Sequence, residues 1–166
     1  VWLLTQDARA AAYALGQAEA SGSVPWNYYD VANGTWLNSE NYPKLWMDGR
    51  GGVGAPGDPN SKGPTQLADN LTGWGADRAH QPELSFVPYI LTGERWMLDN
   101  LQAQASFNIV SVWPEVRKGS ATDVIVNNQQ VRSMAWGLRE IENALWATPD
   151  GTPEKDYLQY LSDTNW

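Results

Sequence analysis

The sequence predicts an all-α protein made of antiparallel helix pairs, with one long loop rich in glycine and tryptophan. Apolar residues recur at three- and four-residue spacing in five segments, which is typical of amphipathic helices. Residues 21–79 hold most of the 15 glycines and half of the 10 prolines, and they show no helical or strand period. A strand pattern is indicated only weakly, over residues 123–126. The length of 166 residues favours a single domain over residues 1–166.

The first predicted helix covers about residues 2–20. Its apolar face consists of small residues and leucines at helical spacing and is expected to pack closely: Leu4, Ala8, Ala11, Ala12, Leu15 and Ala18. Gly22 ends this helix.

The loop region over residues 21–79 is predicted to be ordered. It carries seven large aromatic side chains, Trp26, Tyr28, Tyr29, Trp36, Tyr42, Trp46 and Trp74. Because so many rings are unfavourable in water, we expect the loop to cover a helical scaffold, with only about residues 50–66 mobile.

Residues 80–166 are predicted to form helical hairpins. Helices are expected near residues 82–92, 94–111, 129–147 and 153–163. Pro88 is expected to kink or end the first of these, Asn127 or Asn128 to cap the third, and Thr152 or Pro153 to begin the last.

Composition excludes several classes of function. The net charge of -8 and the pI near 4.5 work against binding to nucleic acid or anionic membrane. The absence of cysteine and the single histidine exclude thiolate and multi-histidine metal sites, and no apolar run is long enough for a membrane span. Asp48, Asp58 and Asn60 do not match the spacing of an EF-hand, so neither a metal nor a cofactor is expected.

One stripe of the helix near residues 129–147 suggests a ligand site. Arg132, Trp136, Arg139 and Asn143 advance by four, three and four residues, so they share one face. Two arginines flanking an indole can hold an anionic or hydroxyl-rich ligand. The alternative is that the arginines pair with Glu140 or Glu142 and that Trp136 packs between helices. The expected core stripe lies on another face and consists of Val131, Met134, Ala135, Leu138, Ile141 and Leu145.

The only histidine, His80, lies where the loop region enters a helix. It is a candidate base, accompanied by Asp77 and Trp74, with Tyr89 further along the helix as a candidate proton donor. The alternative is a histidine that caps the helix through the backbone.

The ten tryptophans and seven tyrosines against two phenylalanines favour rings that face a ligand. Trp26, Tyr28 and Tyr29 are candidates for a platform that stacks on sugars. The alternative is that they pin the loop by packing under it.

Two segments carry a resemblance to a known group. The segments AHQPELSFVPYILTGERW and QVRSMAWGLREIENALWATPD, with the loops SVPW and YPKLWMDGRGG, are similar to helical hairpins of bacterial proteins of the (α/α)-toroid type. Related toroids are glycoside hydrolases and polysaccharide lyases, so the resemblance implies a glycan ligand and an extracellular or periplasmic protein. Five helices cannot close a toroid, which predicts either a piece of a longer chain or a smaller bundle.

Two functions therefore stay open. The first is a carbohydrate-active domain, either a lyase in which His80 takes a proton or a hydrolase using carboxylates among Asp30, Asp48, Asp77 and Glu83. The second is a non-catalytic interaction module of a cell-surface or virion-like assembly, completed by further segments or neighbouring subunits.

Overall fold

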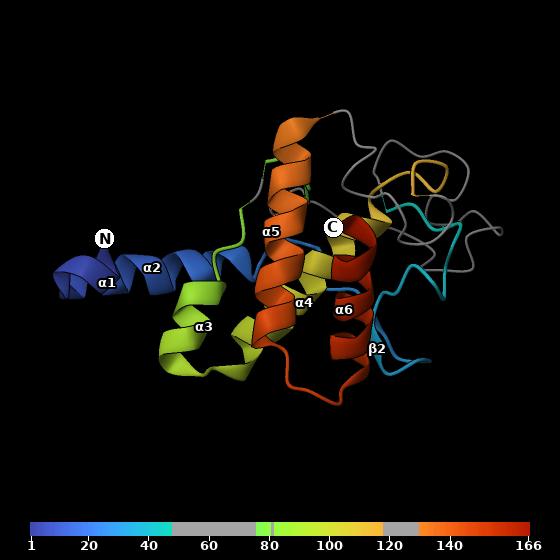
Figure 1. Cartoon of the computed structure of the whole chain (residues 1–166). Coiled ribbons are helices and arrows are strands. Elements are labelled where there is room, and N and C mark those ends of the chain that lie inside the picture. Colours follow the sequence, from blue (N-terminus) through green and yellow to red (C-terminus); the bar gives the residue numbers. More distant parts are fainter. Residues whose placement is uncertain (48–75, 81, 118–129) are drawn as a thin grey trace.

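The computed structural model describes residues 1–47, 76–80, 82–117 and 130–166 (Figure 1). Predictions for Trp74, for the residues of the weak metal pattern (Asp48, Asp58 and Asn60), for the mobile segment 50–66, for the caps Asn127 and Asn128 and for the strand pattern 123–126 lie outside these ranges.

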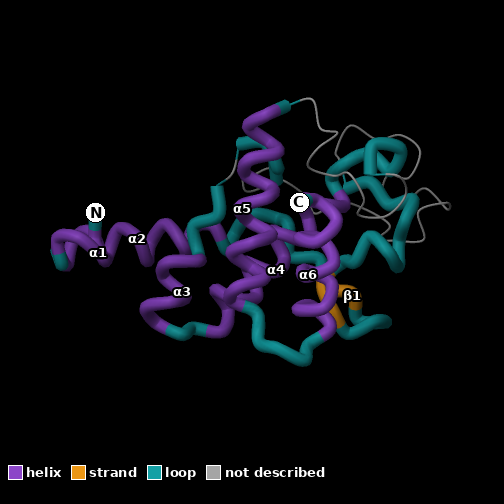
Figure 2. Tube along the Cα trace, viewed as in Figure 1, coloured by secondary structure: helices purple, strands orange, loops and turns teal. Residues whose placement is uncertain are grey.

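The described part of the chain is mostly helical, as predicted, with six helices that hold 57% of its residues (Figure 2). The helices are α1 (Trp2–Thr5), α2 (Ala8–Ser21), α3 (Phe86–Thr92), α4 (Arg95–Val110), α5 (Val131–Ala147) and α6 (Pro153–Asn165). The strands β1 (Tyr29–Asp30) and β2 (Thr35–Trp36) form a two-stranded antiparallel hairpin.

The long N-terminal helix predicted over residues 2–20 is broken into α1 and α2. Gln6 adopts a left-handed conformation with φ of 55°, and Asp7 caps α2 by accepting a hydrogen bond from the Arg9 amide at 2.8 Å. The two helices project from the body as an arm (Figure 1). Its expected apolar face is therefore mostly uncovered: Leu4 is 89% exposed, and only Ala18 and Ser21 of α2 are buried.

The helix predicted near residues 82–92 begins later, at Phe86. The carboxylate of Glu83 accepts a hydrogen bond from the Phe86 amide, which fixes the helix start. Pro88 consequently lies in the first turn, where its missing N–H leaves no helical hydrogen bond unmade, so it does not kink the helix. Gly93 ends α3 in the left-handed region, with φ of 70°, as the Thr92-Gly93 pair predicts.

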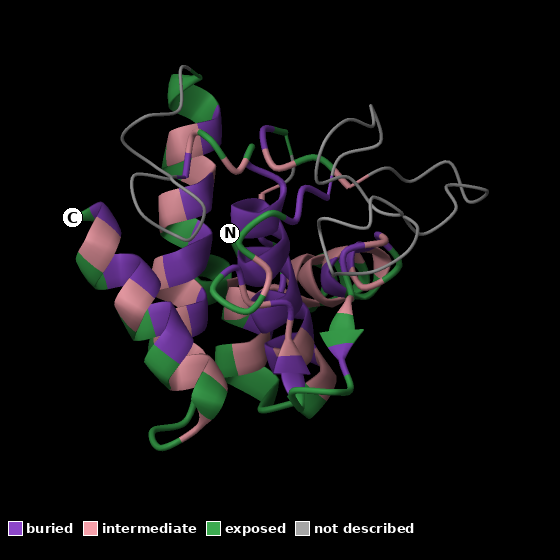
Figure 3. Ribbon diagram, turned by 90° about the vertical axis from the view of Figure 1, so that its right-hand side faces the viewer, coloured by how far each residue is buried: buried purple, intermediate pink, exposed green. Residues whose placement is uncertain are grey.

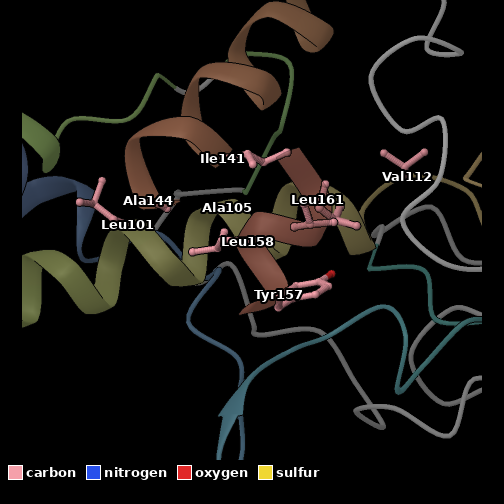
Figure 4. Packing of buried hydrophobic residues seen from close by; sticks show 9 residues of the cluster. Leu101, Ala105, Val112, Ile141, Ala144, Tyr157, Leu158 and Leu161 are labelled. Carbon is pink, nitrogen blue, oxygen red and sulfur yellow. The ribbon is translucent and has the colours of Figure 1, made fainter. Parts of the chain in front are cut away.

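Helix α4 is the centre of the molecule and is covered on all sides over most of its length (Figure 3). One side of α4 packs against the antiparallel pair α5 and α6, in a cluster that includes Leu101, Ile141 and Leu158 (Figure 4). The other side packs against residues 24–47, in a second cluster that includes Trp26, Leu45 and Phe107. This part of the aromatic loop region is therefore ordered over the helical scaffold, as predicted.

Candidate functional site

The candidate site lies where residues 77–80 and 82–83 meet the side of α5. A turn over residues 77–80 places the side chains. The Ala79 amide donates to Asp77 Oδ1 at 2.8 Å, and the His80 amide donates to the Asp77 carbonyl at 3.3 Å. This turn brings the imidazole of His80 next to the carboxylate of Asp77.

His80 is held at both ring nitrogens. Nδ1 contacts Oδ2 of Asp77, and Nε2 contacts Nη2 of Arg132 from the first turn of α5. A guanidinium can only donate and an ionised carboxylate can only accept, so Nδ1 carries the proton and Nε2 presents its lone pair. The ring therefore bonds side chains rather than capping a helix through the backbone. We call Asp77, His80 and Arg132 the histidine cluster.

The histidine cluster lies at the surface, with about half of the His80 and Asp77 side chains exposed. Partial burial by itself raises the pKa of Asp77. The hydrogen bonds from Ala79 and His80, together with the charge of Arg132, outweigh that effect and lower the pKa below its usual value. Asp77 is thus an ionised acceptor that fixes the tautomer of His80.

Further along the same face of α5, Arg139 stacks on Trp136. The guanidinium carbon lies 5.5 Å from the ring centroid, Arg139 is exposed and Trp136 is half-buried. The alternative is that the arginines pair with Glu140 or Glu142. Glu142 instead accepts hydrogen bonds from Ser162 and Trp166, whereas the charge of Arg139 does act on the buried Glu140, so this part of the alternative holds. The stripe therefore presents two cations and an indole toward solvent.

The buried face of α5 differs from the predicted core stripe. Val131 is 73% exposed, and only Ile141 of that stripe is buried. The face that packs on the body consists of Ser133, Gly137, Glu140, Ile141 and Ala144. Three of these five residues, Ser133, Gly137 and Ala144, have small side chains. The predicted apolar stripe and the arginine stripe therefore lie on either side of the buried face instead of opposing each other.

Two buried carboxyl groups lie beneath the arginine stripe. Glu83, 5% exposed, accepts from Asn143 Nδ2 at 3.1 Å, and Glu140, 1% exposed, accepts from Gln104 Nε2 at 2.9 Å. Asn143 is thus engaged in holding Glu83 rather than pointing freely at a ligand. We call Glu83 and Glu140 the carboxyl pair.

Burial raises the pKa of Glu83, although hydrogen bonds from Phe86 and Asn143 and the charge of Arg139 oppose it. Burial raises the pKa of Glu140 well above its usual value, and the charge of Glu83 adds to the effect while that of Arg139 opposes it. The pKa of each member of the carboxyl pair is therefore higher in the folded protein than in the unfolded chain.

A folded-state pKa above the unfolded value near 4.3 stabilises the protein at acidic pH, and this contribution disappears as the pH rises through the folded-state pKa. We expect Glu140→Gln to remove that loss. The free energy of unfolding of the variant, relative to that of wild type, should increase as the pH rises from about 4 to 8.

Urea unfolding followed by helical circular dichroism at several pH values measures this difference. Asp163→Asn, a change at an exposed carboxylate of α6, is the control and should follow wild type. An unchanged difference between wild type and Glu140→Gln across the pH range would show that Glu140 is ionised in the fold.

The aromatic candidates are placed differently. Trp26 is 3% exposed, and its indole N–H donates to Asn100 Oδ1 at 2.8 Å. Tyr28 is half-buried against the cluster under the loop, while Tyr29 is 52% exposed and meets Trp36 edge to face. The packing interpretation thus describes Trp26, and Tyr29 alone of the three offers an open ring.

Tyr89 belongs to α3 and packs against the core cluster of α4, α5 and α6. It lies within electrostatic range of Arg95, at the start of α4. The histidine cluster is instead at the first turn of α5, the end of that helix that points away from α3 (Figure 1). Tyr89 therefore does not join the histidine cluster.

Asp30 has a structural environment. It is 8% exposed and accepts from Tyr42 at 2.7 Å and from Asn33 at 2.6 Å, within the hairpin of β1 and β2. Burial acts to raise the pKa of Asp30, and these hydrogen bonds lower it below its usual value. The carboxylate thus holds the hairpin.

Comparison with known proteins gives no match, whether to a family model, to a curated protein or to a solved structure. The similarity to toroid hairpins therefore stays a prediction. Among the described helices, none is both long and apolar enough to cross a membrane. Within the same residues, no group of three or more acidic or histidine side chains could hold a metal ion.

Proposed function

We propose that the chain is a carbohydrate-active helical domain that binds an acidic polysaccharide along the arginine stripe of α5. The observation that carries the proposal is the contact of Arg132 with a histidine already held by a carboxylate. Guanidinium groups bind carboxylates with two parallel hydrogen bonds, and an indole offers a flat face to a sugar ring. Arg132 and Arg139 are two turns apart, about 10.5 Å along the axis, which suits an extended ligand with repeated charges.

The reaction that this arrangement supports best is β-elimination on a uronate. His80 Nε2 would take the proton from the carbon that bears the carboxylate. The electron pair forms a carbon–carbon double bond while the bond to the neighbouring glycosidic oxygen breaks, and that oxygen takes a proton from water. The hydroxide formed from this water then takes the proton that His80 holds, which restores the neutral imidazole. Arg132 would neutralise the carboxylate during the step.

Hydrolysis by two carboxylates has less support. Of the carboxylates considered for it, Asp30 holds the hairpin, Glu83 is buried under Asn143 and Asp77 is engaged with His80. Asp48 lies outside the described residues. A pair of carboxylates facing one open cleft is what hydrolysis would need.

One observation favours the alternative of an interaction module. The arm formed by α1 and α2 leaves large apolar side chains in solvent, with Leu3 56%, Leu4 89% and Tyr13 71% exposed. A neighbouring subunit could cover them. Sedimentation of the protein alone and of Leu4→Ser tests this, since an assembly module should self-associate through the arm and the variant should not.

The main test is a fluorescence titration with two polymers. We expect polygalacturonate to change the tryptophan fluorescence saturably and dextran, which is neutral, to leave it unchanged. The ultraviolet absorbance of an unsaturated product reports elimination in the same sample. Binding of neither polymer would overturn the proposal.

Substitution of the arginines separates ligand binding from structure. Arg132→Ala and Arg139→Ala are each expected to weaken polygalacturonate binding by about 1.5–3 kcal/mol, the value of a charge-assisted hydrogen bond. Both side chains are exposed, so both variants should remain folded. Lys44→Ala is a suitable control for the loss of one positive charge, because Lys44 is exposed and lies in the loop region on the other side of α4 from α5. Unfolding of either arginine variant would assign that arginine to structure.

A further inference from the structure

The position of Arg132 conflicts with the use of His80 as a base in the free protein. The lone pair that would accept a proton is on Nε2, because Nδ1–H is directed at Asp77. That same lone pair accepts a hydrogen bond from Arg132. Nε2 therefore has the lone pair that a base needs, but in the free protein this lone pair is bonded to Arg132.

We propose that Arg132 is a removable cap on the base nitrogen of His80, and that the carboxylate of a bound uronate removes it. The proposal rests on the proposed function for its ligand, and it makes Arg132 the residue that selects acidic over neutral sugars. The cap can move because Arg132 is exposed and lies at the start of α5, so its long side chain can change rotamer without disturbing the helix.

The competition for Arg132 favours a carboxylate. A neutral imidazole nitrogen offers one uncharged acceptor, whereas a carboxylate accepts two parallel hydrogen bonds from the guanidinium and carries a full charge. A sugar hydroxyl offers no such advantage over the imidazole. An acidic ligand would therefore expose the base at the moment that it delivers the substrate proton, and a neutral glycan would leave it capped.

The chain contains one histidine, so imidazole nitrogen-15 resonances are unambiguous. Spectra of wild type and variants recorded at the same pH, about 8, compare the hydrogen bonding of Nε2. In the free protein we expect the Nε2 resonance of Arg132→Ala to be shifted from that of wild type toward the value of an unbonded nitrogen. Arg139→Ala, which removes the other cation of the same face, should keep the wild-type position.

Addition of tetragalacturonate to wild type should move the Nε2 resonance to the position seen in Arg132→Ala, and maltotetraose should leave it in place. Equal Nε2 shifts in free wild type and free Arg132→Ala would overturn the cap. Saturable binding of tetragalacturonate by tryptophan fluorescence with a fixed Nε2 resonance would overturn the release while the proposed function stands. Absence of binding in the fluorescence titration would overturn both.

Discussion

Replacement of His80 by alanine is expected to reduce the rate of elimination on polygalacturonate by about 10²–10⁴-fold, the usual contribution of a general base. The affinity for the polymer should not fall, because the charges of Arg132 and Arg139 remain on α5 and Arg132 no longer has to leave the imidazole. The rate is measured from the ultraviolet absorbance of the unsaturated product, and the affinity from tryptophan fluorescence.

Tyr89→Phe is the informative control. Its hydroxyl belongs to a ring packed against the core cluster, so the variant should retain the wild-type rate. A large loss of rate in Tyr89→Phe, with activity retained in His80→Ala, would move the proton transfer from the histidine cluster to α3.

Replacement of Trp26 by alanine is expected to lower the free energy of unfolding by about 3–5 kcal/mol. The ring is almost fully buried between the loop region and α4, so its loss leaves a large cavity and the Asn100 carbonyl without its donor. Trp26→Phe keeps most of the apolar contact and loses the N–H, so a smaller decrease of about 1–3 kcal/mol is expected.

Urea unfolding followed by helical circular dichroism measures both variants. At low temperature, where they remain folded, both should bind polygalacturonate as wild type does. A stable Trp26→Ala protein with lost binding would restore Trp26 to the ligand platform.

The starts of α4 and α6 could be predicted closely because their signals are local. Gly93 and the Thr152-Pro153 pair act through the backbone of their own turn, so α4 and α6 begin within one residue of the predicted positions. The signal for the break between α1 and α2 is also local, because Asp7 is an ordinary N-capping residue. An uninterrupted apolar period across it led to the prediction of one helix.

The hairpin of β1 and β2 was not predicted, although it carries a local turn signal. Asn33-Gly34 is the pair that favours a tight turn, and Gly34 has φ of 68°. Strands of two residues are too short for a periodic pattern, so only the turn residues could have indicated them.

The candidate site could be predicted only in part. The shared face of Arg132, Trp136 and Arg139 follows from helical spacing, and the structure adds His80 and Asp77 to it through a chain separation that no periodicity reveals. The burial of Glu140 was not predicted, because hydropathy assigns a glutamate to solvent. Its spacing with Ser133, Gly137 and Ala144 was the available indication.

The polar side chains buried along α4 have a consequence for how the molecule is aligned. Asn100 bonds Ser21, Ser85 and Trp26, Gln102 bonds Trp36 and Thr148, and Gln104 bonds Glu140. Apolar contacts are non-directional, so they fix the position of a helix less sharply than hydrogen bonds do. Here a shift of α4 by one residue would break all of these side-chain hydrogen bonds at once. The bonds therefore fix both the rotation and the axial position of α4. The buried amides of α4 also set the register between the aromatic loop region and α5. With it they set the spacing that the histidine cluster requires.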